Sequence, residues 1–389
     1  MKYLILLCDG MADYPCEIFG GKTPLEYAKT PLFDELAKTA YVGMLKTVDD
    51  SLKPGSDVAN LAVLGYDAVK YYTGRSPLEA GSMGIDMKKT DVAVRCNLVK
   101  LSDDPDFADK TMVSYDGGDI KTEVARPLIE LIEKELGDSE FKFYPGVQYR
   151  HCMVWDGGST GLNLTPPHDI TGKKIKDYLP KNEKILSLME KSSKILPDNL
   201  SIWLWGEGTK PSLPNFTDMT GLKGSIISAV DLLKGIAKFA GMAAPTVPGV
   251  TAYIDTNFSG KANAAIEEFE LGRDLVYMHI EAPDECGHRG EYENKAKALE
   301  LINDLVLAPI WEYLKSAGEY RILLTADHAT PLSLLTHTRD FVPFLFYRSD
   351  KEFAGVSDGF SEKTAADTGI LIEPGYKIMD LLTQDDVQL

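Results

Sequence analysis

The clearest pattern in the chain is a series of short apolar runs, each of strand length and each ending at polar residues. One run opens the chain at residues 2–8 (KYLILLC), and two more occupy residues 274–280 (DLVYMHI) and 321–326 (RILLTA). Apolar runs of this length are typical of buried strands. The pattern therefore predicts core strands that are covered on both faces.

Apolar residues also recur at helical spacing, mainly in the C-terminal half. The expected helices cover residues 219–241, 291–317 with an interruption at Pro309, and 376–382. Helices that alternate with apolar strands predict an α/β fold with a mostly parallel sheet covered by helices on both faces. A strand-like run at residues 200–208 is expected to belong to this core, which would resume near residue 197.

The stretch between residues 82 and 196 has a different pattern. Polar and apolar residues alternate over 91–99, an amphipathic helix is expected over 120–136, and short strand-like runs follow at 141–144 and 149–155. Since 389 residues exceed a typical single domain, we expect a core formed by residues 1–81 and 197–389. A small α+β domain, residues 82–196, would be inserted into it.

Carboxylates and imidazoles follow the three core strands. Asp9 comes directly after the first run, Asp284 and His288 follow the second, and Asp327 and His328 follow the third. In open α/β sheets, ligands bind outside the carboxyl ends of the strands. These side chains are therefore expected to share one site.

A metal centre is the chemistry that this set favours. His337 adds a further imidazole, and mixed carboxylate and imidazole ligands suit manganese, zinc or iron. Two such ions a few ångströms apart are a common arrangement for phosphoryl transfer. Each motif alone has a plainer interpretation: Asp9 can end a turn, Asp284 and His288 can cap a helix, and His337 can be a solvated loop residue. Their conjunction at one sheet edge favours the metal centre.

Ser56 is the candidate nucleophile. Pro54-Gly55 turns the chain, and an apolar-periodic helix begins at the serine. Backbone N–H groups and the helix dipole favour a phosphate at such a position, and a bound metal lowers the pKa of a hydroxyl. A simple helix N-cap is the alternative interpretation.

Taken together, these motifs resemble the cofactor-independent phosphoglycerate mutases of the archaeal type, a branch of the alkaline phosphatase superfamily. The matching segments, in chain order, are 7–13, 54–57, 64–67, 74–80, 223–242, 281–288, 327–337 and 343–345. The resemblance thus spans most of the chain. It implies an alkaline-phosphatase-like core with an inserted cap domain.

The resemblance also implies roles for the residues. One divalent ion would be held by Asp284, His288 and His337, and a second by Asp9, Ser56, Asp327 and His328. Manganese is the expected metal, with magnesium, zinc or cobalt as substitutes. Ser56 would take the phosphoryl group from 3-phosphoglycerate and return it to the other hydroxyl, giving 2-phosphoglycerate without bisphosphoglycerate. Asn60 departs from the pattern, because some relatives are expected to carry a histidine there.

An isomerase of this kind must retain glycerate and exclude water, which favours a lid domain. Arg95, Arg150 and His151 are the candidate cations of the cap, because arginine binds phosphate and carboxylate in bidentate fashion. By resemblance, Lys223 would be a phosphate-side lysine in the core. Ordinary surface or salt-bridge roles are the alternative for all four.

Bulk composition narrows the function classes. The net charge of −18 argues against nucleic-acid binding, and no apolar run reaches the length of a membrane span. The five cysteines are an odd number without metal-type pairing, so reduced thiols and a cytoplasmic location are expected. The sequence leaves the oligomeric state open, a homo-oligomer included.

Two other functions compete with the mutase. A phosphatase, a phosphopentomutase or another phosphoryl-transfer enzyme of the same superfamily could use the same ligands on a different small phosphorylated metabolite. A non-catalytic protein with this fold is disfavoured, because a degenerate copy is expected to have lost some of the ligands.

Overall fold

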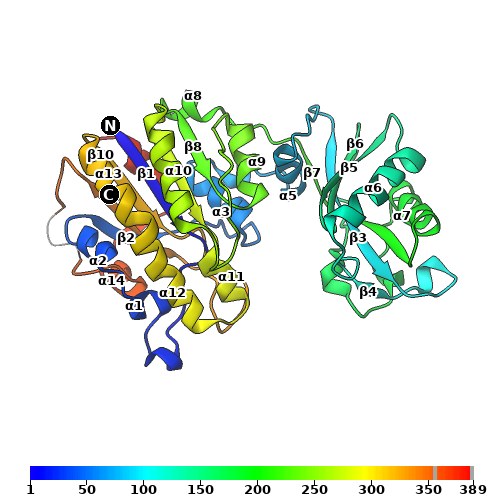
Figure 1. Cartoon of the computed structure of the whole chain (residues 1–389), viewed down its shortest axis with the longest axis horizontal. Coiled ribbons are helices and arrows are strands. Elements are labelled where there is room, and N and C mark those ends of the chain that lie inside the picture. Colours follow the sequence, from blue (N-terminus) through cyan, green and yellow to red (C-terminus); the bar gives the residue numbers. More distant parts are fainter. Residues whose placement is uncertain (354–356, 386–389) are drawn as a thin grey trace. The chain divides into compact units, whose positions relative to one another are not determined.

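The structure, a computed structural model, describes residues 1–353 and 357–385. The chain divides into two compact units, which we call the first unit (Met1–Tyr72 with Leu213–Leu389) and the second unit (Thr73–Ser212). Figure 1 shows that each unit has its own strands and helices. The second unit is an insertion in the first, and it is larger than the predicted 82–196 at both ends.

The first unit is built on a seven-stranded sheet with the order β12-β2-β11-β10-β1-β9-β8. In that order, the strands are Leu371–Ile372, Tyr41–Leu45, Val342–Arg348, Tyr320–Thr325, Lys2–Cys8, Leu275–Ile280 and Gly224–Ile227. β1 pairs in parallel with both β9 and β10, and only the pairs of β11 are antiparallel. The three expected core strands and the mostly parallel sheet are therefore confirmed.

Helices pack on both faces of this sheet. Those that matter for the site are α3 (Ser56–Val63), α10 (Phe258–Glu270), α11 (Ala282–His288), α12 (Tyr292–Ile302), α13 (Ala308–Ser316) and α14 (Glu362–Asp367). Figure 1 shows α10, α12 and α13 running across one face. The predicted interruption at Pro309 is confirmed, because a π-helical turn, Asn303–Leu307, separates α12 from α13. Among the described residues, no helix is both long and apolar enough to cross a membrane.

The helix predicted over 219–241 is wrong in its first half. A short helix, α8 (Phe216–Thr220), ends at Gly221 in the left-handed region, and residues 224–227 form β8 at the edge of the sheet. Only α9 (Asp231–Ala240) is helical as expected. The apolar run at β8 is short, and periodicity does not separate a buried strand from a helix over so few residues.

The second unit contains a five-stranded antiparallel sheet. Its strands are β3 (Val92–Leu101), β4 (Met112–Ser114), β5 (Phe141–Val147), β6 (Arg150–Trp155) and β7 (Leu200–Thr209), and its main helices are α5 (Arg75–Ser82), α6 (Thr122–Leu136) and α7 (Glu183–Ile195). The strands and helix predicted over 91–155 are confirmed. The assignment of 200–208 to the core is wrong, because β7 pairs with β3. Sheet partners follow from long-range contacts, which a local apolar pattern does not encode.

Candidate metal centre and nucleophile

The carboxyl ends of β1 and β10 bring Asp9, Asp327 and His328 together. We call these three residues the inner group. One ligand atom of each lies within 4.8 Å of the others, and all three side chains are buried. Because β1 and β10 are parallel neighbours, residues that follow them directly meet at one edge of the sheet.

Asp284, His288 and His337 form a second set, the outer group. Asp284 and His288 are one turn apart on α11, which follows β9, and His337 comes from the segment after β10. The two Nε2 atoms of the histidines lie 2.8 Å apart, and they lie 3.3 and 3.4 Å from the carboxylate oxygens of Asp284. Nδ1 of His288 lies 3.0 Å from the Leu335 carbonyl. Donation to that carbonyl leaves the Nε2 lone pair free for a ligand.

The donor atoms of both groups fit bound cations. Two imidazole nitrogens at 2.8 Å require a proton or a metal ion between them. In the inner group, Oδ1 of Asp9 is buried without a hydrogen-bond partner. Burial, together with the charges of Asp327 and Asp284, raises the pKa of Asp9 well above its usual range. Carboxylates packed in this way favour a nearby positive charge, and the mixed oxygen and nitrogen donors suit a divalent transition metal.

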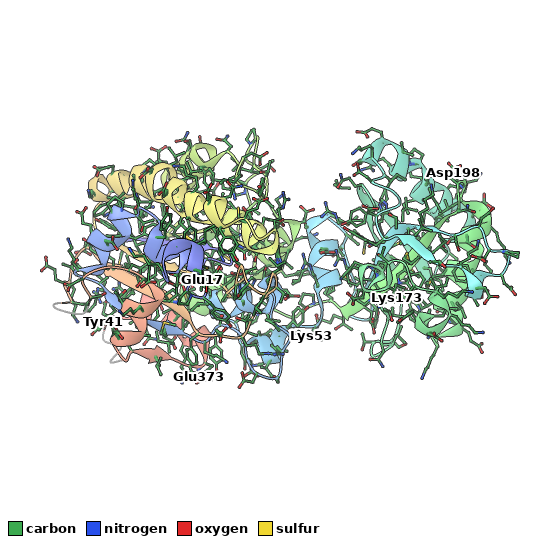
Figure 2. The ribbon with its side chains drawn as sticks, turned by 90° about the horizontal axis from the view of Figure 1, so that it is seen from below. Glu17, Tyr41, Lys53, Lys173, Asp198 and Glu373 are labelled. Atoms are coloured by element: carbon green, nitrogen blue, oxygen red, sulfur yellow. The ribbon has the colours of Figure 1, made fainter. Side chains whose placement is uncertain are left out.

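Ser56 lies beside the inner group. It is the first residue of α3, it is half-buried, and its Oγ lies 3.2 Å from Nε2 of His328. Lys53, in the loop that leads to this serine, is exposed (Figure 2). A hydroxyl next to the inner group and at a helix N-terminus is suited to accept a phosphoryl group.

Sequence reasoning missed His279, which lies inside the apolar run of β9 and is fully buried. Its Nε2 lies 3.1 Å from Oδ2 of Asp9, and its Nδ1 lies 3.2 Å from Oε1 of Glu281. Burial alone would lower the pKa of His279, but hydrogen bonds to these two carboxylates raise it to about 10. Glu281 is also paired with the buried Lys261. The available signal was the pair of polar residues at alternate positions, His279 near the end of the apolar strand β9 and Glu281 directly after it.

Arg95 and Arg150 belong to the second unit and lie on one face of its sheet. Arg150 pairs with Asn97, which is two residues from Arg95 on β3. The Arg95 guanidinium lies 3.1 Å from Glu79 and stacks over the Trp205 ring at 4.2 Å, whereas Arg150 is exposed. Two cations therefore share a face that also carries an aromatic ring.

Two predicted cations are wrong. His151 points to the opposite face of that sheet, where it is 5% exposed, and burial lowers its pKa to about 3, so the imidazole is neutral. Lys223 precedes β8 and its backbone N–H donates to Asp274, which precedes β9. It therefore lies at the amino ends of these strands, whereas the inner and outer groups lie at the carboxyl ends. Of the remaining predicted residues, six form the inner and outer groups, Ser56 lies beside the inner group, and Arg95 and Arg150 share one face of the second unit's sheet.

A family model for 2,3-bisphosphoglycerate-independent phosphoglycerate mutase matches residues 37–200. A probable mutase of this name from Geobacter sulfurreducens is 46% identical over 98% of this chain and 99% of its own. The chain belongs to this mutase family. The mutase of the same name from Methanosarcina barkeri is also 46% identical, over 94% of this chain and 95% of its own.

Solved structures agree with the fold of this phosphoglycerate mutase. A protein from Pyrococcus horikoshii, 26% identical, superposes with a TM-score of 0.80 over 100% of this chain and 99% of its own. The cofactor-independent phosphoglycerate mutase from Thermoplasma acidophilum, 24% identical, gives a TM-score of 0.67 over 99% of both chains. The solved structures therefore confirm the expected fold, and the relatives from Geobacter sulfurreducens and Methanosarcina barkeri confirm the expected family.

Proposed function

We propose that this mutase interconverts 3-phosphoglycerate and 2-phosphoglycerate through a phosphoserine at Ser56, without bisphosphoglycerate. Two divalent metal ions would be held by the outer group and by the inner group with Ser56. Manganese is the metal we favour, with magnesium, zinc or cobalt as substitutes. The observation that carries the proposal is the 3.2 Å distance between Oγ of Ser56 and Nε2 of His328, beside two converging ligand groups.

The bound metals would lower the pKa of the Ser56 hydroxyl and offset the negative charge of the phosphoryl group. Oγ of Ser56 attacks phosphorus, the bond between phosphorus and one glycerate oxygen breaks, and the proton of the Ser56 hydroxyl is transferred to that oxygen, so that glycerate is formed within the site. The other hydroxyl of glycerate then attacks the phosphoserine, the Ser56 oxygen leaves, and a proton passes from the attacking hydroxyl back to Ser56. Backbone N–H groups of Ser56 and Asp57, at the start of α3, would help to hold the phosphoryl oxygens in both steps.

The substrate is a small anion, and the chain is itself strongly acidic, with a net charge of −18. Local cations must therefore offset the overall repulsion. We assign this role to Arg95 and Arg150, so that the second unit acts as the substrate-binding cap. Trp205 and Glu79 support the assignment, because the ring packs against the Arg95 guanidinium and the carboxylate pairs with it, so that the position of the guanidinium is fixed.

A coupled assay tests the proposal. Chelator-treated protein is restored with manganese and given 3-phosphoglycerate without bisphosphoglycerate, and 2-phosphoglycerate and free phosphate are measured together. We expect isomer that forms only with metal. Free phosphate without isomer would assign the same centre to a phosphatase, and no product would overturn the assigned substrate.

A further inference from the structure

Asn60 lies one turn after Ser56 on α3 and is fully buried. Its Nδ2 donates to the Ser56 carbonyl at 2.8 Å and to Oδ2 of Asp327 at 3.0 Å. Its Oδ1 accepts from the hydroxyl of Tyr277 on β9 at 2.6 Å. One side chain thus connects the nucleophile's residue, a residue of the inner group and a buried tyrosine.

Tyr277 fixes the orientation of the Asn60 amide. Both N–H bonds of Nδ2 are used by oxygen acceptors, and Oδ1 faces a hydroxyl donor. A flipped amide would place Oδ1 against a carbonyl and a carboxylate, which are acceptors only. Burial raises the pKa of Tyr277 well above its usual range, so its hydroxyl stays protonated.

The hydrogen bonds of Asp327 show what this orientation achieves. Its Oδ1 accepts from the backbone N–H groups of Gly10, at 3.1 Å, and His328, at 2.9 Å. Its Oδ2 accepts from Asn60 and also lies 3.3 Å from Nε2 of His328. Since a carboxylate oxygen has two lone pairs, one lone pair of Oδ2 stays directed at the inner group.

We propose that Asn60, held by Tyr277, is a positioning residue that fixes the positions of Ser56 and Asp327 relative to each other. It acts through both of them: the Ser56 carbonyl sets where the serine lies, and the remaining Oδ2 lone pair sets where the inner metal binds. This proposal rests on the proposed function for its effect on turnover. Its effect on metal binding does not depend on which reaction is catalysed.

The first test removes one hydroxyl with Tyr277→Phe, with Tyr66→Phe as the matched control. Tyr66 is also fully buried, and its hydroxyl donates to the Pro214 carbonyl at 2.9 Å, away from the metal ligands. Both variants lose one hydrogen bond from the hydroxyl of a fully buried tyrosine, so similar shifts in Tm are expected. Only Tyr277→Phe should lower kcat about tenfold, with little change in KM, and weaken the inner manganese site about tenfold.

The second test is a double-mutant cycle on kcat and on manganese affinity. If Tyr277 acts only through Asn60, adding Tyr277→Phe to Asn60→Ala should cause no further loss. Equal kcat and manganese affinity in the two tyrosine variants, or additive losses in the cycle, would overturn the proposal. If the native protein forms no isomer, the proposed function fails, whereas the manganese affinities of the variants still decide the positioning role.

Discussion

The inner and outer groups use the same kinds of ligand but are built differently. The inner histidine, His328, is completely buried. The side chains of His288 and His337, in the outer group, are 34% and 21% exposed to solvent. The inner ligands follow central strands, and the outer ligands lie on the seven-residue helix α11 and on a loop. In the proposed two-metal centre, the inner position is therefore pre-organised by the core, whereas the outer position is more open to solvent. A chelator should therefore remove the outer metal first.

The two groups are not independent, because Thr330 joins them. Its Oγ1 is hydrogen-bonded to Oδ1 of Asp284 and lies 3.2 Å from Nδ1 of His328. The segment that carries Thr330 also carries residues of both groups. Variants can therefore be chosen that affect the inner group, the outer group, or the segment around Thr330 that contacts both.

The largest effect is expected for Ser56→Ala, which removes the nucleophile beside the inner group. Turnover should fall by at least about 1,000-fold, while the fold and the outer metal are retained. Ser51→Ala is the control, because Ser51 is exposed and its hydroxyl donates to Asp49. Mutase activity near that of the native protein would refute Ser56 as the nucleophile.

The second prediction separates the two groups directly. Asp327→Asn should lower the affinity for the inner manganese ion by more than about 100-fold. Asp284→Asn should lower the affinity for the outer ion by a similar factor. Titrations followed by electron paramagnetic resonance would count the ions that each variant retains. Unchanged manganese affinity in Asp284→Asn would count against the outer site, and loss of both ions in either variant would show that the groups bind as a unit.

The third prediction concerns the segment around Thr330, which contacts both groups. Nζ of the buried Lys295 donates to Oδ2 of Asp13 at 2.7 Å and to the Thr330 carbonyl at 2.8 Å. Lys295→Met leaves the Asp13 carboxylate buried without its cation, which should lower the free energy of unfolding by about 3–5 kcal/mol. Urea unfolding measures this loss, and Lys297→Met, at an exposed position of the same helix, is the control. Both metal affinities should fall together, and loss at one group alone would contradict a shared support.

The sequence predicted the inner group well for a physical reason. Asp9 and Asp327 come directly after apolar runs, and parallel neighbours bring such positions to one edge. Lys223 was misplaced because the strand that follows it was hidden in a predicted helix, so its edge of the sheet could not be inferred. His279 was missed because it lies inside an apolar run: its neighbour Glu281 was visible in the same segment, but its contact with Asp9, which comes from β1, follows only from the pairing of β1 with β9.

His151 could have been assigned correctly from the sequence. Adjacent residues of a strand point to opposite faces, so Arg150 and His151 cannot both face one ligand. Alternation therefore predicts that only one of the two residues faces the ligand. It does not say which of the two faces is packed against the interior of the second unit. The membership of β7 in the second sheet had no comparable local signal, because it depends on pairing with β3.

The smallest predicted effect is a pH dependence of the free energy of unfolding. It should not distinguish the inner group from the outer group. Glu362, at the start of α14, accepts from the Asp13 N–H at 3.1 Å and from the Thr23 hydroxyl at 2.7 Å. Burial raises its pKa from 4.5 to about 7. The folded state therefore binds this proton more tightly than the unfolded state, so the stability that Glu362 contributes is complete below about pH 4.5 and is lost as the pH rises through about 7.

Glu362→Gln keeps the neutral side chain at every pH. The free energy of unfolding of the metal-free variant should therefore fall less between pH 4.5 and 7 than that of the native protein, and Glu319→Gln, at an exposed position, should follow the native profile. Parallel profiles for all three proteins would show that Glu362 does not titrate in this range. Because Asp13 also accepts from the N–H of Leu332, in the segment that carries both groups, the variant should not favour one metal position over the other.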